Sequence, residues 1–584
     1  MPSIGRVFYP NVDPRQAEPV WQYGRDICGN AWDHVSRVFE NHEKAGRMEH
    51  GAQDGNPVAA QLPLVSALQN PAVYEHAVTE LQLLETHISW VILTGKYVYK
   101  IKKALDFGFL DYSTLEKRRY YCHEELRLNR RFAPQLYIDV VTISGTAERP
   151  SLQAGAKSIE YAVRMKQFPQ SGLLSTLAAS NALTPETIDA LALLVSAMHA
   201  AVDRADPQAE WGMPDDIHNW VMENFVHIRP ALHEAQPRQQ LQAIESWCRR
   251  EFTDKQALLE RRRCDGFVRE CHGDLHLGNL TLIEGRISPF DGIEFNPHLR
   301  WIDVISEIAF LVMDIRDRGF PRLAVRLLNA YLQHTGDYSG LGVLRYYLVY
   351  RALVRAKVAV LRLPQAKSTI DIQNVWYEYS TYMDLAACYV RPPIAALIIT
   401  HGVSGSGKSY YAAHLAERLG AIQVRSDIER KRLHGYAAAA DTQSAVKAGI
   451  YSADASVRTY QQLAALAGTV IEAGYPVIVD ATFLQFAWRE QFRQLSVSLA
   501  VPFLLLHFEA DRDTLCTRIR GRQMAGGDPS EAGIDVLDAQ FASREPLMPE
   551  EMADVLSVDS GRDIPLNDLQ GQVVERIPAM MAGE

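Results

Sequence analysis

Apolar and polar positions along the first two thirds of the chain predict an extension followed by a globular module. Residues 1–60 are rich in Pro, Gly, Asn, His and charge, so we expect a partly disordered N-terminal extension. Two β-rich runs follow, at 87–93 and 97–101, and a Thr-Gly-Lys turn between them predicts a hairpin. Beyond Asp189 the apolar period is mostly helical, apart from a β-rich patch at 267–295.

The pattern of apolar positions changes after Arg391, where two prolines interrupt the helical period. Short apolar runs then alternate with helical segments, and this alternation is typical of a parallel sheet built from βαβ units. The runs lie at 397–400, 422–424, 477–480 and 503–508. We therefore predict three parts, which are the extension 1–60, a first module at 61–390 and a second at 391–584.

Composition narrows the class of protein. A chain of 584 residues, 47% of them apolar, is too long for one core, and a net charge of -10 provides no general field for a nucleic-acid backbone. The seven cysteines form no C-x-x-C pair, which fits neither a disulfide framework nor a zinc site. The scattered cysteines favour a reducing cytoplasm, and no run approaches the roughly 18 apolar residues that span a bilayer, so we expect no membrane partner.

A phosphate-binding motif opens the second module. Residues 402–409, GVSGSGKS, match G-x4-G-K-[ST] in full and follow the apolar run 396–400, a plausible buried strand. Glycines let successive backbone N–H groups surround phosphates, and the next helix adds a partial positive charge. Lys408 is then expected to reach the β- and γ-phosphates of ATP, and Ser409 to hold Mg²⁺. The expected nucleotide-binding residues are Gly402, Ser404, Gly405, Ser406, Gly407, Lys408 and Ser409.

The strand after this motif ends just before Asp427, and strand ends are where ligands meet an open α/β sheet. With Asp427 and Arg430, residues 394–560 resemble the small P-loop kinases that include 5′-polynucleotide kinases, chloramphenicol phosphotransferases and zeta-type toxins. The resemblance implies that Asp427 orients an acceptor hydroxyl as general base, that Arg430 contacts substrate, and that Asp480 lies near Mg²⁺ or substrate. It also implies a lid of Arg518 and Arg522, for which a solvated basic helix face is the alternative.

A second constellation lies in the first module. Residues 272–279, HGDLHLGN, have the H-x-D-x4-N spacing of a protein-kinase catalytic loop. A hairpin expected over 280–290 returns the chain to Asp291, so Asn279 and Asp291 are expected to share Mg²⁺. Asp274 would then face an acceptor hydroxyl, which it positions more than it deprotonates.

This module resembles the aminoglycoside phosphotransferase family over roughly residues 62–388, through its HGD string, its Phe-Asp-Gly-Ile-Glu stretch at 290–294 and Asp303. The resemblance implies a bilobal protein-kinase-like fold in which Lys100 binds the α- and β-phosphates and Glu125 is its ion-pair partner. It also implies that Asp303 supports the loop and that the HGD histidine, His272, braces backbone.

Two neighbours compete for the roles of the lysine and the glutamate. Lys102 lies on the same strand face as Lys100, and Glu124 directly precedes Glu125. The nucleotide hairpin holds one glycine, Gly95, where protein kinases have G-x-G-x-x-G, which leaves the loop over the phosphates open.

Together these motifs predict a multidomain α+β and α/β protein, with a bilobal protein-kinase-like fold followed by a P-loop parallel-sheet domain. The predicted function is an ATP- and Mg²⁺-dependent phosphotransferase that transfers the γ-phosphate to hydroxyl groups of small molecules. In one alternative, a single module is catalytic and the other senses nucleotide or ligand. In another, the second module is a kinase for nucleic-acid ends or nucleotide sugars, although composition neither indicates nor excludes nucleic acid.

Overall fold

The computed structural model describes most of the chain after residue 56. The described residues are 57–106, 108, 110–153, 157–391, 394–438, 440, 449–525 and 530–577. Residues 1–56 of the expected extension, and Pro392 and Pro393 at the expected join, lie outside this part of the chain. Pro57–Gly583 form one unit. Helix α3 (Pro57–Ala67) begins within the stretch expected to be an extension, and its Leu64 and Val65 are buried.

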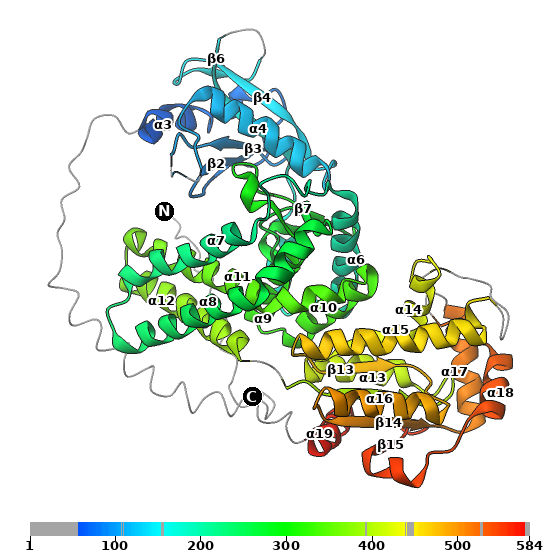
Figure 1. Cartoon of the computed structure of the whole chain (residues 1–584). Coiled ribbons are helices and arrows are strands. Elements are labelled where there is room, and N and C mark those ends of the chain that lie inside the picture. The colour runs from blue at the N-terminus through cyan, green and yellow to red at the C-terminus, as the bar shows by residue number, and fades with distance from the viewer. Residues whose placement is uncertain are drawn as a thin grey trace. The chain divides into compact units, whose positions relative to one another are not determined.

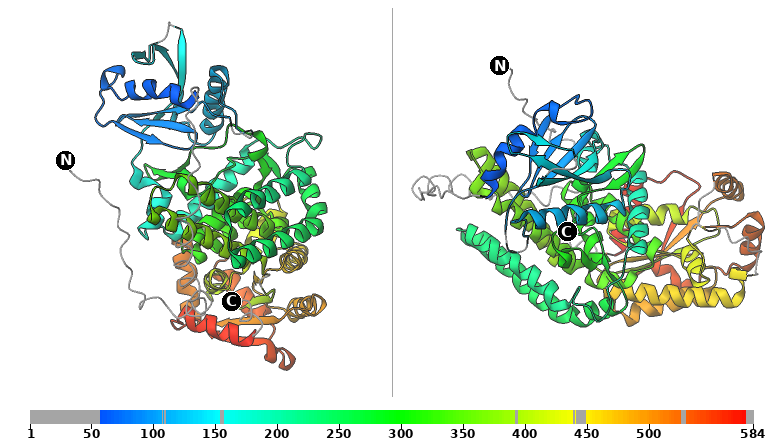
Figure 2. Two further views of the ribbon diagram at one scale, coloured as in Figure 1. Left: turned by 90° about the vertical axis from the view of Figure 1, so that its left-hand side faces the viewer. Right: turned by 90° about the horizontal axis from the view of Figure 1, so that it is seen from above.

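The first module begins with a six-stranded antiparallel sheet in the order β1-β2-β3-β6-β4-β5. Its strands are the blue to cyan arrows in Figure 2. The expected hairpin is present, because β2 (Ser89–Leu93) pairs with β3 (Tyr97–Lys102) around Gly95, whose φ is +86°. Helix α4 (Leu115–Arg130) packs against β6 and β4, and the Thr114 side chain caps its N-terminus. The remaining strands are β1 (Gln82–Glu85), β4 (Tyr137–Gly145), β5 (Pro150–Ser151) and β6 (Ser158–Lys166).

A helical lobe follows this sheet. It contains the second expected hairpin, β8 (Leu280–Ile283) with β9 (Arg286–Pro289), and a short pair, β7 (Val268–Glu270) with β10 (Trp301–Asp303). Helix α9 (Val304–Asp317) is buried over most of its length, and helix α11 (Leu341–Leu361) lies in the stretch beyond Asp189 that was expected to be mostly helical. The other helices are α5 (Leu174–Ala179), α6 (Pro185–Ala201), α7 (Pro214–Ile228), α8 (Ala235–Cys264), α10 (Pro321–Thr335) and α12 (Thr369–Val390).

The second module is built on a parallel sheet of five strands in the order β12-β13-β11-β14-β15 (Figure 1). Four strands match the expected apolar runs, and these are β11 (Leu397–His401), β12 (Ile422–Arg425), β13 (Val477–Asp480) and β14 (Phe503–Glu509). The fifth, β15 (Val555–Asp559), was not predicted. The helices are α13 (Lys408–Leu419), α14 (Ser426–Leu433), α15 (Ala453–Glu472), α16 (Phe486–Ser498), α17 (Arg512–Ala525), α18 (Ile534–Ser543) and α19 (Leu566–Arg576).

The predicted fold class is confirmed by these topologies. An antiparallel sheet with one packed helix precedes a helical lobe that carries the HGD loop and its hairpin, as in protein-kinase-like folds, and a parallel-sheet P-loop domain follows. Among the described residues, no helix has the length and apolar character needed to cross a bilayer. The module boundary near residue 391 stays a prediction.

Candidate active sites

The glycines after β11 adopt conformations that force the chain into a tight loop. Gly402, Gly405 and Gly407 have φ angles of +145°, +82° and +80°. A Cβ atom at Gly402 would lie 2.6 Å from the carbonyl oxygen of Phe508, and one at Gly405 would lie 2.9 Å from that of Leu515. The loop runs directly into α13, whose N-terminus adds a partial positive charge. This arrangement fits a phosphate group.

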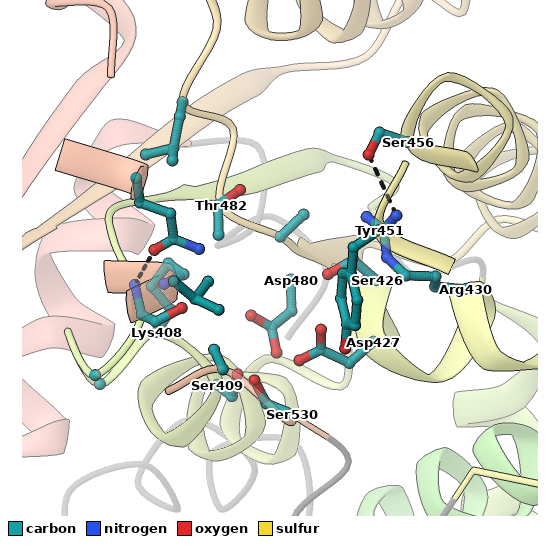
Figure 3. Close-up of a pocket in the computed structure, with 18 of the residues that line it drawn as sticks. Lys408, Ser409, Ser426, Asp427, Arg430, Tyr451, Ser456, Asp480, Thr482 and Ser530 are labelled. Carbon is teal, nitrogen blue, oxygen red and sulfur yellow. Dashed lines mark hydrogen bonds between the residues drawn. The ribbon is translucent and has the colours of Figure 1, made fainter. Parts of the chain in front are cut away.

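A pocket of about 410 Å³ lies at the carboxyl ends of the strands beside this loop (Figure 3). Gly402 and Ser406 are outside its lining, and Ser406 is fully buried behind Lys408. The pocket brings together most of the residues that the sequence motifs single out in the second module. Those in its wall are Ser404, Gly405, Gly407, Lys408, Ser409, Asp427, Arg430, Asp480, Arg518 and Arg522.

Lys408 is folded back against the loop. Its Nζ donates to the Val403 carbonyl oxygen at 2.7 Å and lies 3.4 Å from Ser406 Oγ. Burial lowers the pKa of Lys408 to about 8, although Asp480 and Asp427 act in the opposite direction. An anionic phosphate in the pocket would therefore stabilise the charged form of this lysine.

Oxygen ligands of the kind that Mg²⁺ prefers face one another in the pocket. Figure 3 shows Ser409, Asp427 and Asp480 with their oxygens directed toward the same region. Asp480 is 4% exposed, and burial raises the pKa of its carboxyl group, although Arg425 and the Ser409 hydroxyl oppose this effect. Asp480 Oδ2 also accepts a hydrogen bond from Gln423 Nε2 at 3.1 Å. The donor set therefore fits a magnesium ion.

Three arginines border the pocket, and each donates to backbone carbonyl groups. Arg430 Nη1 donates to the Ile450 oxygen at 2.9 Å, and its guanidinium lies 5.2 Å from the centre of the Tyr451 ring. Arg518 Nη2 donates to the carbonyl oxygen of Ser560, and Arg522 Nη2 to that of Ala532, both at 2.7 Å. Arg518 and Arg522, four residues apart on α17, both line the pocket, as one helix face requires.

The sequence motifs gave no sign of an aromatic wall in the pocket. Tyr451, Tyr460 and Trp488 line it, and the Tyr460 and Trp488 rings stack with centroids 4.7 Å apart and planes inclined by 6°. Aromatic side chains at helical positions are ordinary core residues, so their spacing carries no signal for a binding site. Gln540 was also not predicted, and its Oε1 accepts from the Ser404 N–H at 2.7 Å.

In the first module, two lysines of β3 share one carboxylate. Lys100 Nζ lies 2.9 Å from Glu125 Oε1 and also pairs with Asp291, whereas Lys102 Nζ lies 2.7 Å from Glu125 Oε2 and also pairs with Glu294. Burial acts to lower the pKa of Lys100, but Asp291 and Glu125 outweigh it and raise the pKa well above its usual value. Both lysines are therefore charged.

Glu124, the other candidate for the ion pair with the β3 lysine, binds different residues. Glu124 lies 2.7 Å from Arg127 and 2.9 Å from Arg300, away from the two lysines. Glu125 is fully buried, and although burial acts to raise its pKa, Lys100 and Lys102 lower it. The ion pair that the resemblance implies is thus present between Lys100 and Glu125, with Lys102 as a second partner.

The HGD loop presents Asp274 beside Asn279. Asn279 Nδ2 donates to the backbone oxygen of Asp274 at 2.9 Å and to its Oδ2 at 3.0 Å, which turns the amide oxygen of Asn279 the other way. The Phe290 N–H donates to the Asn279 carbonyl oxygen at 3.0 Å, and this bond places Asn279 next to Asp291 at the open end of the β8–β9 hairpin. Asp274 is 40% exposed, and His276 keeps the pKa of its carboxyl group below the usual range although burial acts to raise it.

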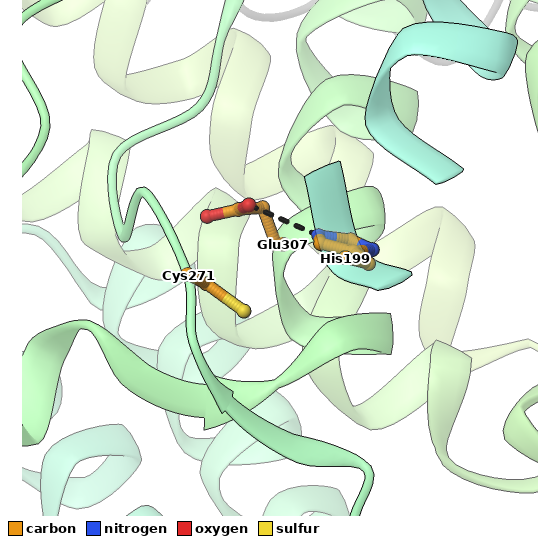
Figure 4. A group of neighbouring side chains, drawn as sticks. All are labelled: His199, Cys271 and Glu307. Carbon is orange, nitrogen blue, oxygen red and sulfur yellow. Dashed lines mark hydrogen bonds and ion pairs between the residues drawn. The ribbon is translucent and has the colours of Figure 1, made fainter. Parts of the chain in front are cut away.

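Buried side chains lie next to the HGD loop and support it through hydrogen bonds. Figure 4 shows three side chains of this cluster, which are His199, Cys271 and Glu307. Glu307 Oε1 accepts from the Gly273 N–H at 2.7 Å, its Oε2 lies 3.0 Å from His199 Nε2, and His199 Nδ1 lies 2.9 Å from the Tyr331 hydroxyl. The side chains of His199, Glu307 and Cys271 are close enough to hold a metal. Because the histidine nitrogens and glutamate oxygens already have partners, and burial raises the pKa of the Cys271 thiol, the cluster fits a hydrogen-bonded support instead.

His272 and Asp303 also support the loop. His272 Nε2 donates to the Phe290 carbonyl oxygen at 2.9 Å, as a bracing histidine would. Asp303 accepts from Arg262 at 2.7 and 2.9 Å and caps α9 through the Ile305 N–H. Arg262 also holds Asp337 at 2.7 Å, so one buried guanidinium joins two helix caps.

Comparisons with known proteins cover both modules. An uncharacterized protein of Mycobacterium tuberculosis (strain ATCC 25618 / H37Rv) is 27% identical over 476 residues, which are 80% of this chain and 92% of the relative. An uncharacterized protein of Mycobacterium bovis matches to the same extent.

Among solved structures, a sugar kinase from Janibacter sp. HTCC2649 is 20% identical and covers 32% of this chain and 98% of its own, with a TM-score of 0.26. A choline/ethanolamine kinase family protein from Mesorhizobium loti is 9% identical and covers 56% of this chain and 98% of its own, with a TM-score of 0.33. Residues 397–547 match the model of the AAA domain family, and together with the motif at 402–409 and the parallel sheet this match identifies the segment as a P-loop domain.

Proposed function

We propose that the protein is an ATP-dependent phosphotransferase that transfers the γ-phosphate of ATP to a hydroxyl group of a small molecule. One observation carries the proposal. A single pocket of about 410 Å³ combines a glycine cradle, a buried lysine and the oxygens of Ser409, Asp427 and Asp480. A loop that only turned the chain would not need a buried charge or converging carboxylates beside it.

In the P-loop pocket, the loop N–H groups and Lys408 bind the phosphates, and Ser409 and Asp480 hold Mg²⁺. Held by these two residues, Mg²⁺ would supply positive charge that offsets the negative charge developing during transfer. Asp427 orients the acceptor hydroxyl and accepts its proton as the new O–P bond forms, while the bond to the ADP oxygen breaks. Arg430 contacts the acceptor.

Arg518 and Arg522 bind the transferring phosphoryl group in this proposal. Their anchors on the Ser560 and Ala532 carbonyl oxygens support this role, because each leaves the guanidinium at the pocket wall with its geometry fixed. A wholly solvated basic face would not need such anchors.

The first module provides a second site of the same chemistry. Lys100, held by Glu125, binds the α- and β-phosphates, Asn279 and Asp291 hold Mg²⁺, and Asp274 positions the acceptor hydroxyl. Lys100 pairs with Asp291 in the structure. In this proposal, Lys100 would instead contact phosphate when nucleotide is bound, and Asp291 would hold Mg²⁺.

A screen with γ-labelled ATP tests the proposal. Wild-type protein is incubated with fractions of a metabolite extract in the presence of Mg²⁺, and label transfer is followed for wild type, Asp427→Ala and Asp274→Ala. We expect each variant to lose transfer to the acceptors of its own module by at least about a hundredfold and to keep transfer to the others. If neither substitution changes any transfer, the proposal is wrong; if one alone has an effect, the other module is a sensing domain.

A further inference from the structure

A helix of the first module covers the edge of the parallel sheet beside the P-loop pocket. Strand β12 is the outermost strand on its side, and the polar groups along its outer edge need partners. Asn329 of α10 supplies them, because its Oδ1 accepts from the Gln423 N–H at 2.7 Å and its Nδ2 donates to the Ala421 carbonyl oxygen at 2.9 Å. Asn329 is 7% exposed, so water competes little for these bonds.

The side chain of Gln423 connects this edge with the carboxylate in the pocket. Its Nε2 donates to Asp480 Oδ2 at 3.1 Å, and its Oε1 lies 3.5 Å from Nε2 of Gln333, which is also on α10. Both Gln423 and Asp480 are 4% exposed. An ionised carboxylate only accepts hydrogen bonds, so the amide nitrogen of Gln423 is the group that faces Asp480.

This hydrogen bond acts on Asp480 through its geometry. Gln423 Nε2 supplies a donor to one oxygen of a carboxylate that is 4% exposed, and a buried carboxylate oxygen without a donor is costly. The bond directs Oδ2 toward β12, where Arg425 Nε also lies 3.7 Å away, and so restrains the rotation of the carboxylate. Groups that orient a metal ligand in this way contribute strongly to metal affinity.

We propose that Gln423 is a positioning residue for metal binding in the P-loop pocket, held in place by Asn329 of the first module. The inference rests on the proposed function of that pocket, because it concerns how Asp480 receives Mg²⁺. It means that the helical lobe of one module supports the metal ligand of the other through the chain Asn329, Gln423 and Asp480, all within one unit.

The test uses the full chain, and every variant also carries Asn279→Ala and Asp291→Ala. These two substitutions remove the expected Mg²⁺ ligands of the first module, so that metal binding is measured in the P-loop pocket alone. Calorimetry measures ATP affinity with Mg²⁺ and with EDTA, and the ratio of the two reports the metal contribution. Gln423→Met keeps the length of the side chain but removes its amide. We expect its affinity in EDTA to stay within twofold and its affinity with Mg²⁺ to fall about tenfold. Asn329→Leu should lose about threefold with Mg²⁺.

Arg326→Ala is the matched control. Arg326 lies on the same helix and pairs with Glu417 of α13 at 2.7 Å, a contact to the second module that does not involve Gln423 or Asp480. The ratio of its ATP affinity with Mg²⁺ to its ATP affinity in EDTA should equal that of the protein with Asn279→Ala and Asp291→Ala alone. An equal loss in Arg326→Ala and Gln423→Met would overturn the inference, since it would reflect a general weakening of the packing.

Gln423→Glu provides a second readout and keeps the shape of the side chain if Gln423→Met folds poorly. It also removes the amide donor, so its Mg²⁺ contribution should fall while its ATP affinity in EDTA stays within twofold, a selective loss that a general structural defect would not produce. A full Mg²⁺ contribution in both Gln423 variants overturns the inference and leaves the proposed function standing. If the protein with Asn279→Ala and Asp291→Ala alone binds no Mg²⁺-ATP, the proposed function of the pocket and the inference both fail.

Discussion

Lys100 and Lys102 bind the two oxygens of a single carboxylate, that of Glu125, at 2.9 and 2.7 Å. They can do so because residues two apart on a strand face the same side. Their other partners differ, since Lys100 pairs with the half-exposed Asp291 and Lys102 with the buried Glu294. The Lys102 side chain is 1% exposed and that of Lys100 is 10% exposed. Lys100 therefore fits contact with a nucleotide, and Lys102 fits the support of Glu125.

This division of roles predicts different defects for the two lysines. Lys102→Met should lower the stability of the first module by about 3 to 5 kcal/mol, because two buried carboxylates lose a shared cation. Lys100→Met should mainly weaken ATP binding at this site, by about tenfold or more. Scanning calorimetry measures the first effect and ATP titration in a Lys408→Met background the second. Lys117→Met is the control, since Lys117 and its partner Asp111 are both partly exposed and the substitution should leave stability nearly unchanged. Equal stability losses in Lys100→Met and Lys102→Met would contradict the division.

Lys408 predicts a pH-dependent gain in stability when it is replaced. Its pKa falls from 10.5 to about 8 on folding, so the charged form is destabilised in the unliganded protein at pH 7. Lys408→Met should therefore stabilise the second module by about 3 kcal/mol at pH 7. The unfolded chain binds more protons than the folded one between pH 8 and 10.5, so the wild type gains stability in this window and the difference shrinks. Urea unfolding at pH 7, 9 and 10.5 measures it, and a constant difference would contradict the assignment.

If the pocket-lining arginines of α17 act on the transferred phosphoryl group, replacing one of them should slow phosphoryl transfer. If they only form a solvated basic helix face, the replacement should have little effect. Arg522→Ala should slow phosphoryl transfer by about a hundredfold while ATP affinity changes less, because the guanidinium acts on charge that develops in the transition state. Arg520→Ala is the matched control, since Arg520 is exposed, lies on the same helix and is not in the pocket wall. The comparison uses label transfer under single-turnover conditions. Similar rates for the two variants would favour the solvated-face alternative.

The hydrogen-bonded pair of His199 and Glu307 predicts that chelators leave the stability of the first module unchanged. Because this cluster is held by hydrogen bonds, overnight dialysis against EDTA should leave the Tm of the first module unchanged, and added Zn²⁺ should not raise it. Glu307→Ala should cost about 3 kcal/mol, since it leaves the Gly273 N–H and His199 without their acceptor. A clear fall in Tm with EDTA, reversed by Zn²⁺, would show that the cluster is a metal site.

Local patterns sufficed for much of the fold. The glycine turn at Gly95 and the turn at 284–285 marked both hairpins, and the apolar runs marked four of the five strands of the parallel sheet. Strand β15 was missed because its short run, with exposed Ser557 at its centre, resembles any half-buried segment. Strands β4 and β6 were also not predicted, although Gly145 ends β4 with a φ of +88°, because the segment of β5 lies between them in sequence and their pairing contains register shifts.

The site could be predicted only where chemistry follows a fixed spacing. The glycine loop, Lys408 and the HGD string have such spacing, and the pocket brings Asp427 and Asp480 to Lys408 because parallel strands end on one edge. The contact of Asn329 with Gln423 joins residues 94 positions apart through packing, which no sequence spacing encodes. The same holds for the aromatic wall at Tyr460 and Trp488.

The most direct test of the account is a calorimetric titration of the full chain with ATP in the presence of Mg²⁺. The account predicts two binding events, of which Lys408→Met removes one and Lys100→Met removes or weakens the other. Omission of Mg²⁺ should weaken both. A wild-type titration without binding heat, or one that neither substitution changes, would show that two pockets of this chain do not hold Mg²⁺-ATP.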